Sequence, residues 1–152
     1  MAQRGMSVTV GFRGGMAFES RGPSGHAILL DAAAEAGGAD SAARPMEALL
    51  AALGSCSGID VVHILRKMRI PFDGLEIRID AARRDEHPRI FTGIDLEYVV
   101  RGRGLAAKRA RVEEAVRLSQ EKYCSVAGML RPAAELRYRV TIEDPDANEE
   151  EN

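Results

Sequence analysis

One stretch of this 152-residue chain constrains its fold more than any other, because residues 46–69 predict a helix that is apolar on nearly every side. Large aliphatic side chains fill its centre: Leu49, Leu50, Leu53, Ile59, Val61, Val62, Ile64 and Leu65. A helix of this pattern is buried on most of its sides. It would be about 36 Å long, which exceeds the diameter of a small domain. We therefore expect a second copy of the chain to supply part of its cover.

Three short strands are predicted ahead of this helix. Residues 7–12 alternate between apolar and other side chains, and residues 16–21 and 26–31 follow after Gly-rich turns. The next segment is rich in Gly and Ala and predicts a loop, which leads to Pro45, a favourable residue for the first turn of a helix.

Two strands, a second helix and a last strand are predicted after it. Residues 75–83 and 89–100 alternate and are predicted to form a long hairpin. Residues 106–130 are predicted to form a helix that Pro132 ends, and residues 135–142 a strand. This order predicts an α+β fold with antiparallel sheets, as one domain over residues 1–143. The acidic tail, residues 144–152, is too poor in apolar side chains to pack, so we expect disorder there.

Charge and hydropathy narrow the class of protein. The net charge is −2 and the sequence pI is about 6.0, which gives no electrostatic footprint for nucleic acid. The N-terminus lacks the apolar core of a signal peptide, and no continuous apolar stretch approaches the length of a membrane span. We expect a cytoplasmic protein that binds neither nucleic acid nor membrane.

The chain has two cysteines, Cys56 and Cys124, and both lie in apolar helical segments. Neither has a His or Cys at the spacing of a zinc site, so no metal is expected. Free cysteines are commonly buried small hydrophobes. Cys56, however, is flanked by glycines and serines that leave room for a substrate, and Asp60 and His63 follow on its helix face. These features favour a reactive thiol, and in a reducing compartment a disulfide would be transient.

Two segments carry a resemblance to a known family. The helix opening PMEALLAALGSCSGIDVV around Cys56 and the segment KYCSVAGML around Cys124, within this order of elements, are similar to the OsmC/Ohr family of osmotically induced and organic-hydroperoxide-resistance proteins. The resemblance covers about residues 6–143, and several further stretches look like an OsmC-like subgroup of that family.

The resemblance implies an OsmC-like fold, an activity and a partner. It implies an intertwined homodimer with each active site at the subunit interface. It also implies a thiol peroxidase in which Cys56 attacks the hydroperoxide and becomes a sulfenic acid, which Cys124 resolves to a disulfide. A dithiol reductant would return the electrons, and no metal or organic cofactor takes part.

The chain departs from the family's pattern at two positions. The family's active-site glutamate directly follows the helix-opening proline, whereas here the acidic residue is Glu47, one position later. The family also uses an arginine from the N-terminal strands to stabilise the thiolate. Arg21 and Arg13 are the candidates, with Arg21 preferred because it flanks a turn. Without that arginine, Cys56 would depend on His63 or on His26.

The sequence predicts a cytoplasmic homodimer that reduces hydroperoxides, organic ones above all, in oxidative stress defence. One alternative is a non-catalytic OsmC-like protein that binds a small molecule or senses oxidation through its thiols. A second is a structural dimer whose thiols are buried and inert. Catalytic turnover of peroxide with a dithiol distinguishes the first alternative, and alkylation of the native thiols distinguishes the second.

Overall fold

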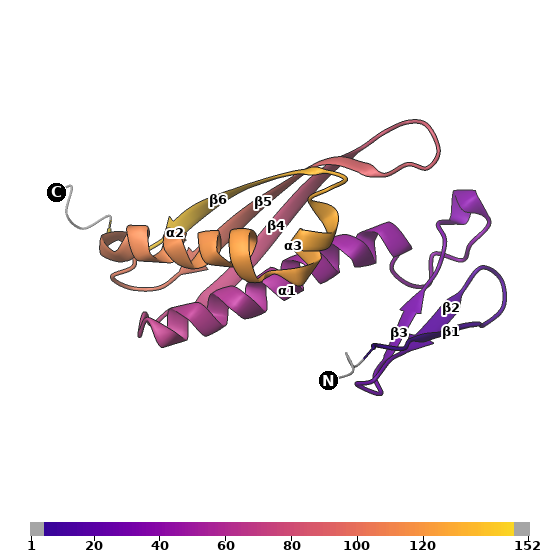
Figure 1. Ribbon diagram of the computed structural model, residues 1–152, viewed down its shortest axis with the longest axis horizontal. Coiled ribbons are helices and arrows are strands. Elements are labelled where there is room, and N and C mark those ends of the chain that lie inside the picture. Colours follow the sequence, from indigo (N-terminus) through magenta and orange to yellow (C-terminus); the bar gives the residue numbers. More distant parts are fainter. Residues whose placement is uncertain (1–4, 148–152) are drawn as a thin grey trace. The chain divides into compact units, whose positions relative to one another are not determined.

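A computed structural model describes residues 5–147 (Figure 1). Contacts within the chain group into two compact units, one up to Leu50 and one from Ala51. The single domain predicted over residues 1–143 stays a prediction. Both units contain part of the long helix α1, Pro45–Lys67. The α+β class is confirmed, with one three-stranded sheet in each unit.

The N-terminal unit holds the three predicted strands. They are β1 Thr9–Phe12, β2 Phe18–Arg21 and β3 Ala27–Leu30, which pair antiparallel in the order β1-β2-β3. Gly14 and Gly15 adopt positive φ values of 97° and 56° in the first turn, a conformation that other residues rarely adopt. A short 3₁₀ turn, Ala34–Ala36, interrupts the loop before α1.

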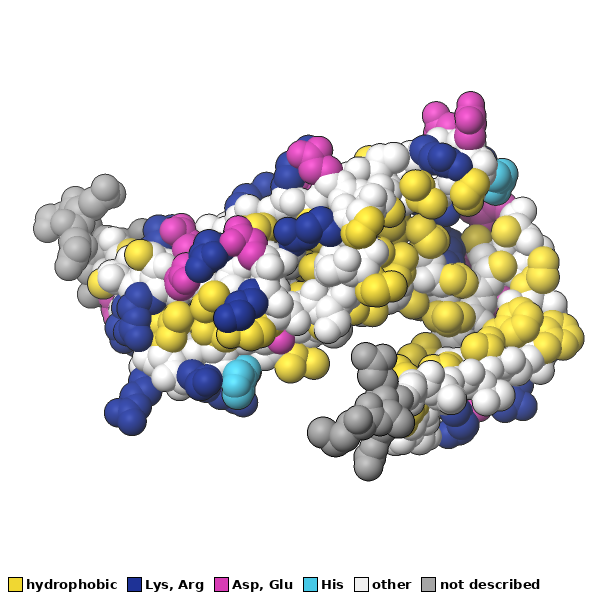
Figure 2. Space-filling model, in the orientation of Figure 1, with side chains coloured by type: hydrophobic (Ala, Val, Ile, Leu, Met, Phe, Trp, Pro, Cys, Tyr) yellow, Lys and Arg dark blue, Asp and Glu magenta, His cyan; other side chains and the backbone are white. Residues whose placement is uncertain are grey.

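One face of this sheet is apolar and exposed. The register places Phe12 opposite Phe18, and their ring centroids are 5.6 Å apart. Val10 and Ile28 lie on the same face, since both flank Ser20 across the sheet. The exposed fractions of Val10, Phe12, Phe18 and Ile28 are 60%, 62%, 42% and 58%. Figure 2 shows hydrophobic side chains gathered on one face of the N-terminal unit.

A buried aspartate organises the loop that follows β3. The carboxylate of Asp31 accepts hydrogen bonds from the backbone N–H groups of Ala32, Ala39 and Ser41 and from the Ser41 hydroxyl. The bonds from Ser41 lower the pKa of Asp31 most. The sequence predicts only a loop here. Hydrogen bonds between Asp31 and residues eight to ten positions later leave no periodic pattern from which they could be predicted.

Helix α1 confirms the prediction for residues 46–69 to within two residues at its end. The buried positions within α1 recur every four residues, at Leu53, Ser57, Val61 and Leu65. By its length and composition alone, α1 could cross a membrane. The sequence-based expectation was that no segment is apolar enough over that length. A core helix of a water-soluble protein can have the same length and composition, so this is weak evidence of a span.

The C-terminal unit has a second sheet in the order β4-β5-β6, formed by β4 Gly74–Arg83, β5 Phe91–Arg101 and β6 Glu135–Glu143. The predicted hairpin is confirmed, with Ile77 opposite Tyr98 and Ile79 opposite Leu96. The expectation of purely antiparallel sheets is wrong at β6, which pairs parallel to β5. The helices between β5 and β6 provide the long crossover that parallel pairing requires.

The predicted second helix, residues 106–130, is broken into several pieces. A 3₁₀ turn, Ala106–Lys108, leads into α2, Arg109–Leu118, which continues as a π-helical turn, Ser119–Tyr123. Helix α3, Ser125–Leu130, follows after one extended residue. The pattern of apolar residues could not predict this break, because the break lies at Ser119 and Gln120, which are polar and buried.

This sheet has one covered and one open face. Helices α1 and α2 lie along the covered face (Figure 1), and the side chains of Ile94, Leu96 and Tyr98 are fully or almost fully buried. The opposite face carries ion pairs, such as Arg137 with Asp95 at 2.7 Å. Where the sequence predicts disorder from residue 144, residues 144–147 form a turn, because Asp144 accepts bonds from the N–H groups of Gly104 and Ala106. The remaining predicted tail, residues 148–152, lies outside the described residues.

Candidate functional site

Cys56 lies in the middle of α1, directly before the buried Ser57. Its side chain is half-buried, and its thiol is free. Gly54 and Gly58 let α1 approach β4 closely, since a Cβ at Gly54 would lie 3.0 Å from Ile79 Cδ1 and one at Gly58 would lie 3.2 Å from Ile77 Cδ1. Gly54 and Gly58 therefore serve helix–sheet packing.

Cys124 stands between the π-helical turn and α3. Its backbone is extended, with φ −69° and ψ 106°, and its Sγ accepts a hydrogen bond from Ala127 N at 3.4 Å. Its exposed fraction is 5%, and burial is the main cause that raises the pKa of the Cys124 thiol to about 11. The neighbouring Cys56 thiol and the Asp60 carboxylate favour the protonated form as well. The fold thus brings the two thiols together.

Asp60 follows Cys56 by one helical turn. Among residues 5–147 its carboxylate forms no ion pair and instead accepts a hydrogen bond of 3.0 Å from the Ser119 hydroxyl. Asp60 therefore connects the helix of Cys56 to the segment that precedes Cys124.

A buried cluster of hydroxyl and amide groups joins α1, β5 and the π-helical turn that precedes Cys124. We call it the polar cluster, and its members are Ser57, Tyr98, Ser119 and Gln120. Ser57 Oγ lies 2.6 Å from the Tyr98 hydroxyl and 2.7 Å from Ser119 Oγ. Gln120 Nε2 donates to the Tyr98 hydroxyl at 2.6 Å. Burial is the main cause that raises the pKa of Tyr98, so its hydroxyl stays protonated at neutral pH.

Sequence reasoning missed the polar cluster entirely. One signal was available, because Ser57 occupies the position between Leu53 and Val61 in the buried four-residue repeat of α1. A hydroxyl on such a face needs a buried partner. The identity of that partner could not be read from the sequence, since Tyr98 and Ser119 are 41 and 62 residues away.

The other predicted site residues lie in the N-terminal unit. Glu47 accepts a hydrogen bond of 3.3 Å from the backbone N–H of Arg44, as in half of a capping box at the start of α1. Arg21 and Arg13 both form ion pairs of 3.1 Å with Glu19. Arg21 also donates to the Gly25 carbonyl at 2.9 Å. A role of Glu47, Arg21 or Arg13 at Cys56 stays a prediction.

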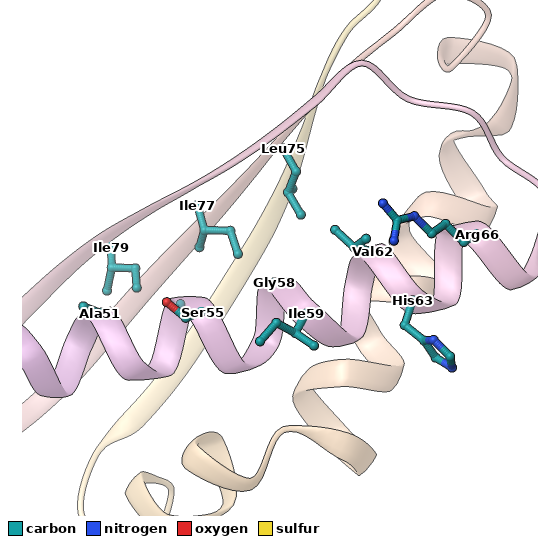
Figure 3. Close-up of a pocket in the computed structure, with 11 residues that line it drawn as sticks. Ala51, Ser55, Gly58, Ile59, Val62, His63, Arg66, Leu75, Ile77 and Ile79 are labelled. Carbon is teal, nitrogen blue, oxygen red and sulfur yellow. The ribbon is translucent and has the colours of Figure 1, made fainter. Parts of the chain in front are cut away.

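Two hollows flank α1 in the C-terminal unit. A groove of about 790 Å³ runs between α1 and β4, where Leu75, Ile77 and Ile79 point toward the helix (Figure 3). His63 and Arg66 lie at one end of it. A cavity of about 470 Å³ lies between α1 and the π-helical turn, and it is lined by Asp60, His63, Ile64, Lys67, Met68, Leu118 and Tyr123.

The arrangement of the thiols permits a specific chemistry. A half-buried thiol that meets a second, buried thiol can be oxidised to a sulfenic acid and then condense to a disulfide. Residues 5–147 contain no group of three or more His, Cys, Asp or Glu side chains that could hold a metal ion.

Comparisons with known proteins place this geometry in context. Residues 38–139 match the family model for OsmC-like proteins. Protein YhfA of Escherichia coli K12 is 44% identical over 128 residues, which cover 84% of this chain and 91% of YhfA. The crystal structure of a hypothetical protein from Aquifex aeolicus VF5 has 33% identity and a TM-score of 0.76, and the match covers 93% of this chain and all of that one. An organic hydroperoxide resistance protein OsmC from Legionella pneumophila has 17% identity and a TM-score of 0.65, with 93% and 99% of the two chains covered, a likeness of fold alone.

Proposed function

The chain belongs to the OsmC-like protein family, and we propose that it is a thiol peroxidase that reduces organic hydroperoxides through Cys56 and Cys124. One observation carries the proposal. The chain has two cysteines, far apart in sequence, and the fold brings them near each other, because Ser57 beside Cys56 bonds at 2.7 Å to Ser119 in the turn that ends at Cys124. A peroxide-related stress role agrees with the family, some of whose structural relatives are named for hydroperoxide resistance.

The proposed reaction has two steps. The Cys56 thiolate attacks the distal oxygen of ROOH, the O–O bond breaks, and Cys56 becomes a sulfenic acid while RO⁻ takes a proton and leaves as ROH. Cys124 then gives up its proton and its sulfur attacks Cys56, so that an S–S bond forms, the S–O bond breaks and water leaves. An external dithiol supplies the two electrons that reduce the disulfide.

A second copy of the chain completes the proposed enzyme. The exposed apolar face of β1–β3 and the groove beside α1 support this proposal, because a contiguous apolar surface of this kind commonly marks a protein interface. In the proposed homodimer an arginine of the N-terminal strands, Arg21 or Arg13, stabilises the Cys56 thiolate, and Glu47 holds that arginine. We propose the cytoplasm as its compartment, since reducing conditions there keep both thiols available.

Steady-state reduction of cumene hydroperoxide tests the proposal, with dithiothreitol or a lipoyl dithiol as reductant. We expect turnover by the wild type and none by Cys56→Ser. Cys124→Ser should stop at a sulfenic acid on Cys56 that dimedone traps. Peptide mapping that finds the first oxidation on Cys124, or no disulfide at all, would contradict the assigned roles.

A second candidate function is a non-catalytic one, in which the protein binds an apolar small molecule or senses oxidation. The groove of about 790 Å³ between α1 and β4 favours it. A sensor would be oxidised once by one equivalent of peroxide and would show no sustained turnover with a dithiol. The same assay therefore separates the two functions.

A further inference from the structure

We propose that the polar cluster is a clamp that positions Cys124 for its attack on oxidised Cys56, acting through the π-helical turn Ser119–Tyr123. Ser57, Tyr98, Ser119 and Gln120 are thus positioning residues that touch neither peroxide nor sulfur. The inference rests on the proposed function, since it concerns the second step of that reaction.

The π-helical turn sets the position of Cys124. The turn closes with a hydrogen bond of 2.8 Å from Cys124 N to the carbonyl of Ser119, five residues earlier. A π-turn holds one residue more than an α-helical turn, so relaxation to an α-helix would rotate Cys124 by about 100° around the axis. Such a rotation would turn its thiol away from Cys56.

The polar cluster holds the first two residues of that turn. The Ser119 hydroxyl bonds to Ser57 and Asp60 of α1, and the Gln120 amide donates to Tyr98 of β5. Arg131 of the segment after α3 donates to the Gln120 carbonyl at 2.5 Å. The turn before Cys124 is therefore tied to the residue that follows Cys56 and to the central strand of the sheet.

The number of available protons determines which group donates in each hydrogen bond of the polar cluster. A carboxylate only accepts, so the single proton of the Ser119 hydroxyl goes to Asp60. Ser57 must then donate to Ser119, and the Tyr98 hydroxyl must donate to Ser57 while it accepts from Gln120 Nε2. The bonds form one chain that ends on Asp60, and the loss of any hydroxyl in it removes a hydrogen bond from a buried neighbour.

Gln120 indicates that the cluster serves more than stability. Its Oε1 is buried and is without a hydrogen-bond partner among residues 5–147. An unpaired buried polar atom costs free energy, and an apolar side chain of similar size would avoid that cost. A glutamine that carries this cost is expected where the position of its neighbours matters to function.

The test measures the two steps of the reaction separately in two variants, Tyr98→Phe and Ser119→Ala. Each variant removes one hydroxyl of the polar cluster. Stopped-flow oxidation by one equivalent of cumene hydroperoxide gives the rate of sulfenic acid formation, and acid-quenched peptide mapping gives the rate of disulfide formation. We expect disulfide formation to slow about ten-fold, the effect of one hydrogen bond that no longer fixes the geometry, with little change in sulfenic acid formation. Ser119→Thr, which keeps the hydroxyl, should restore the rate.

Matched controls and an independent readout keep the inference falsifiable. Thr92→Val and Ser125→Ala remove exposed hydroxyls from the same unit and should change neither step. Equilibration with oxidised and reduced glutathione measures how readily Cys124 closes the disulfide without any peroxide, and the clamp variants should show about a ten-fold lower equilibrium constant. Folded clamp variants with wild-type disulfide formation in both assays would overturn the clamp. A wild type that closes the disulfide in glutathione but does not react with peroxide would overturn the proposed function alone.

Discussion

The two cysteines differ in their surroundings more than in their sequence context. Cys56 is half-buried on a helix with small neighbours, whereas Cys124 is buried and its thiol is held in the protonated form by that burial. The thiolate is the reactive form of cysteine. Burial and the raised pKa therefore both lower the reactivity of the Cys124 thiol. This difference supports the proposed roles of Cys56 as the attacking thiol and Cys124 as the resolving thiol.

Alkylation of the reduced native protein tests the difference. At pH 7.5 iodoacetamide should modify Cys56 and leave Cys124 unmodified, because burial raises the pKa of the Cys124 thiol to about 11. Since a raised pKa keeps the proton on the thiol below that value, modification of Cys124 should begin only as the pH approaches 11. Mass spectrometry of the tryptic peptides gives both rates, and urea-unfolded protein, in which the two should react alike, is the control.

Arg21 and Arg13 are the residues to replace in search of the group that activates Cys56. If one of them stabilises the thiolate, its replacement by Ala or Lys should move the pH profile of Cys56 alkylation upward and slow peroxide turnover, because an ammonium poorly replaces a bidentate guanidinium. Arg21 and Arg13 both form an ion pair with Glu19. The variant of one arginine therefore controls for the loss of an ion pair to Glu19 in the variant of the other. Wild-type behaviour of both variants would leave His63 or His26 as the activating group.

At the scale of elements, two glycines of α1 fix its distance from β4. Replacement of Gly54 by Leu should lower the free energy of unfolding by about 1–3 kcal/mol, because its Cβ already would meet Ile79 Cδ1 at 3.0 Å. Gly128 of α3 has open space around its Cα, so Gly128→Ala should raise stability by about 0.5–1 kcal/mol through helix propensity. Urea denaturation at one protein concentration measures both. Equal effects of the two variants would mean that helix propensity, and not the approach to β4, decides at Gly54.

The whole molecule is expected to be a dimer. Val10→Asp and Phe12→Asp place a charge on the exposed apolar face of β1–β3 and should convert the dimer to monomer in sedimentation equilibrium, since the charge would lose its water in an interface. Thr9→Asp, on the other face of the same strand, is the matched control and should leave the dimer intact. A wild type that sediments as a folded monomer at low micromolar concentration would contradict the expectation. A true dimer should also unfold at a higher temperature as its concentration rises.

The sequence by itself determined the elements, because their signals are local. Alternating side chains predicted the strands, the apolar run predicted α1 with Cys56 on it, and the quoted motifs identified the family. Only the tertiary structure decided that β6 runs parallel to β5, that a π-helical turn precedes Cys124, and that Asp60 bonds to Ser119. Each of these depends on contacts between residues tens of positions apart. Hydrogen bonds of buried polar groups have no periodicity in a sequence, and they take their partners from whatever the fold brings near.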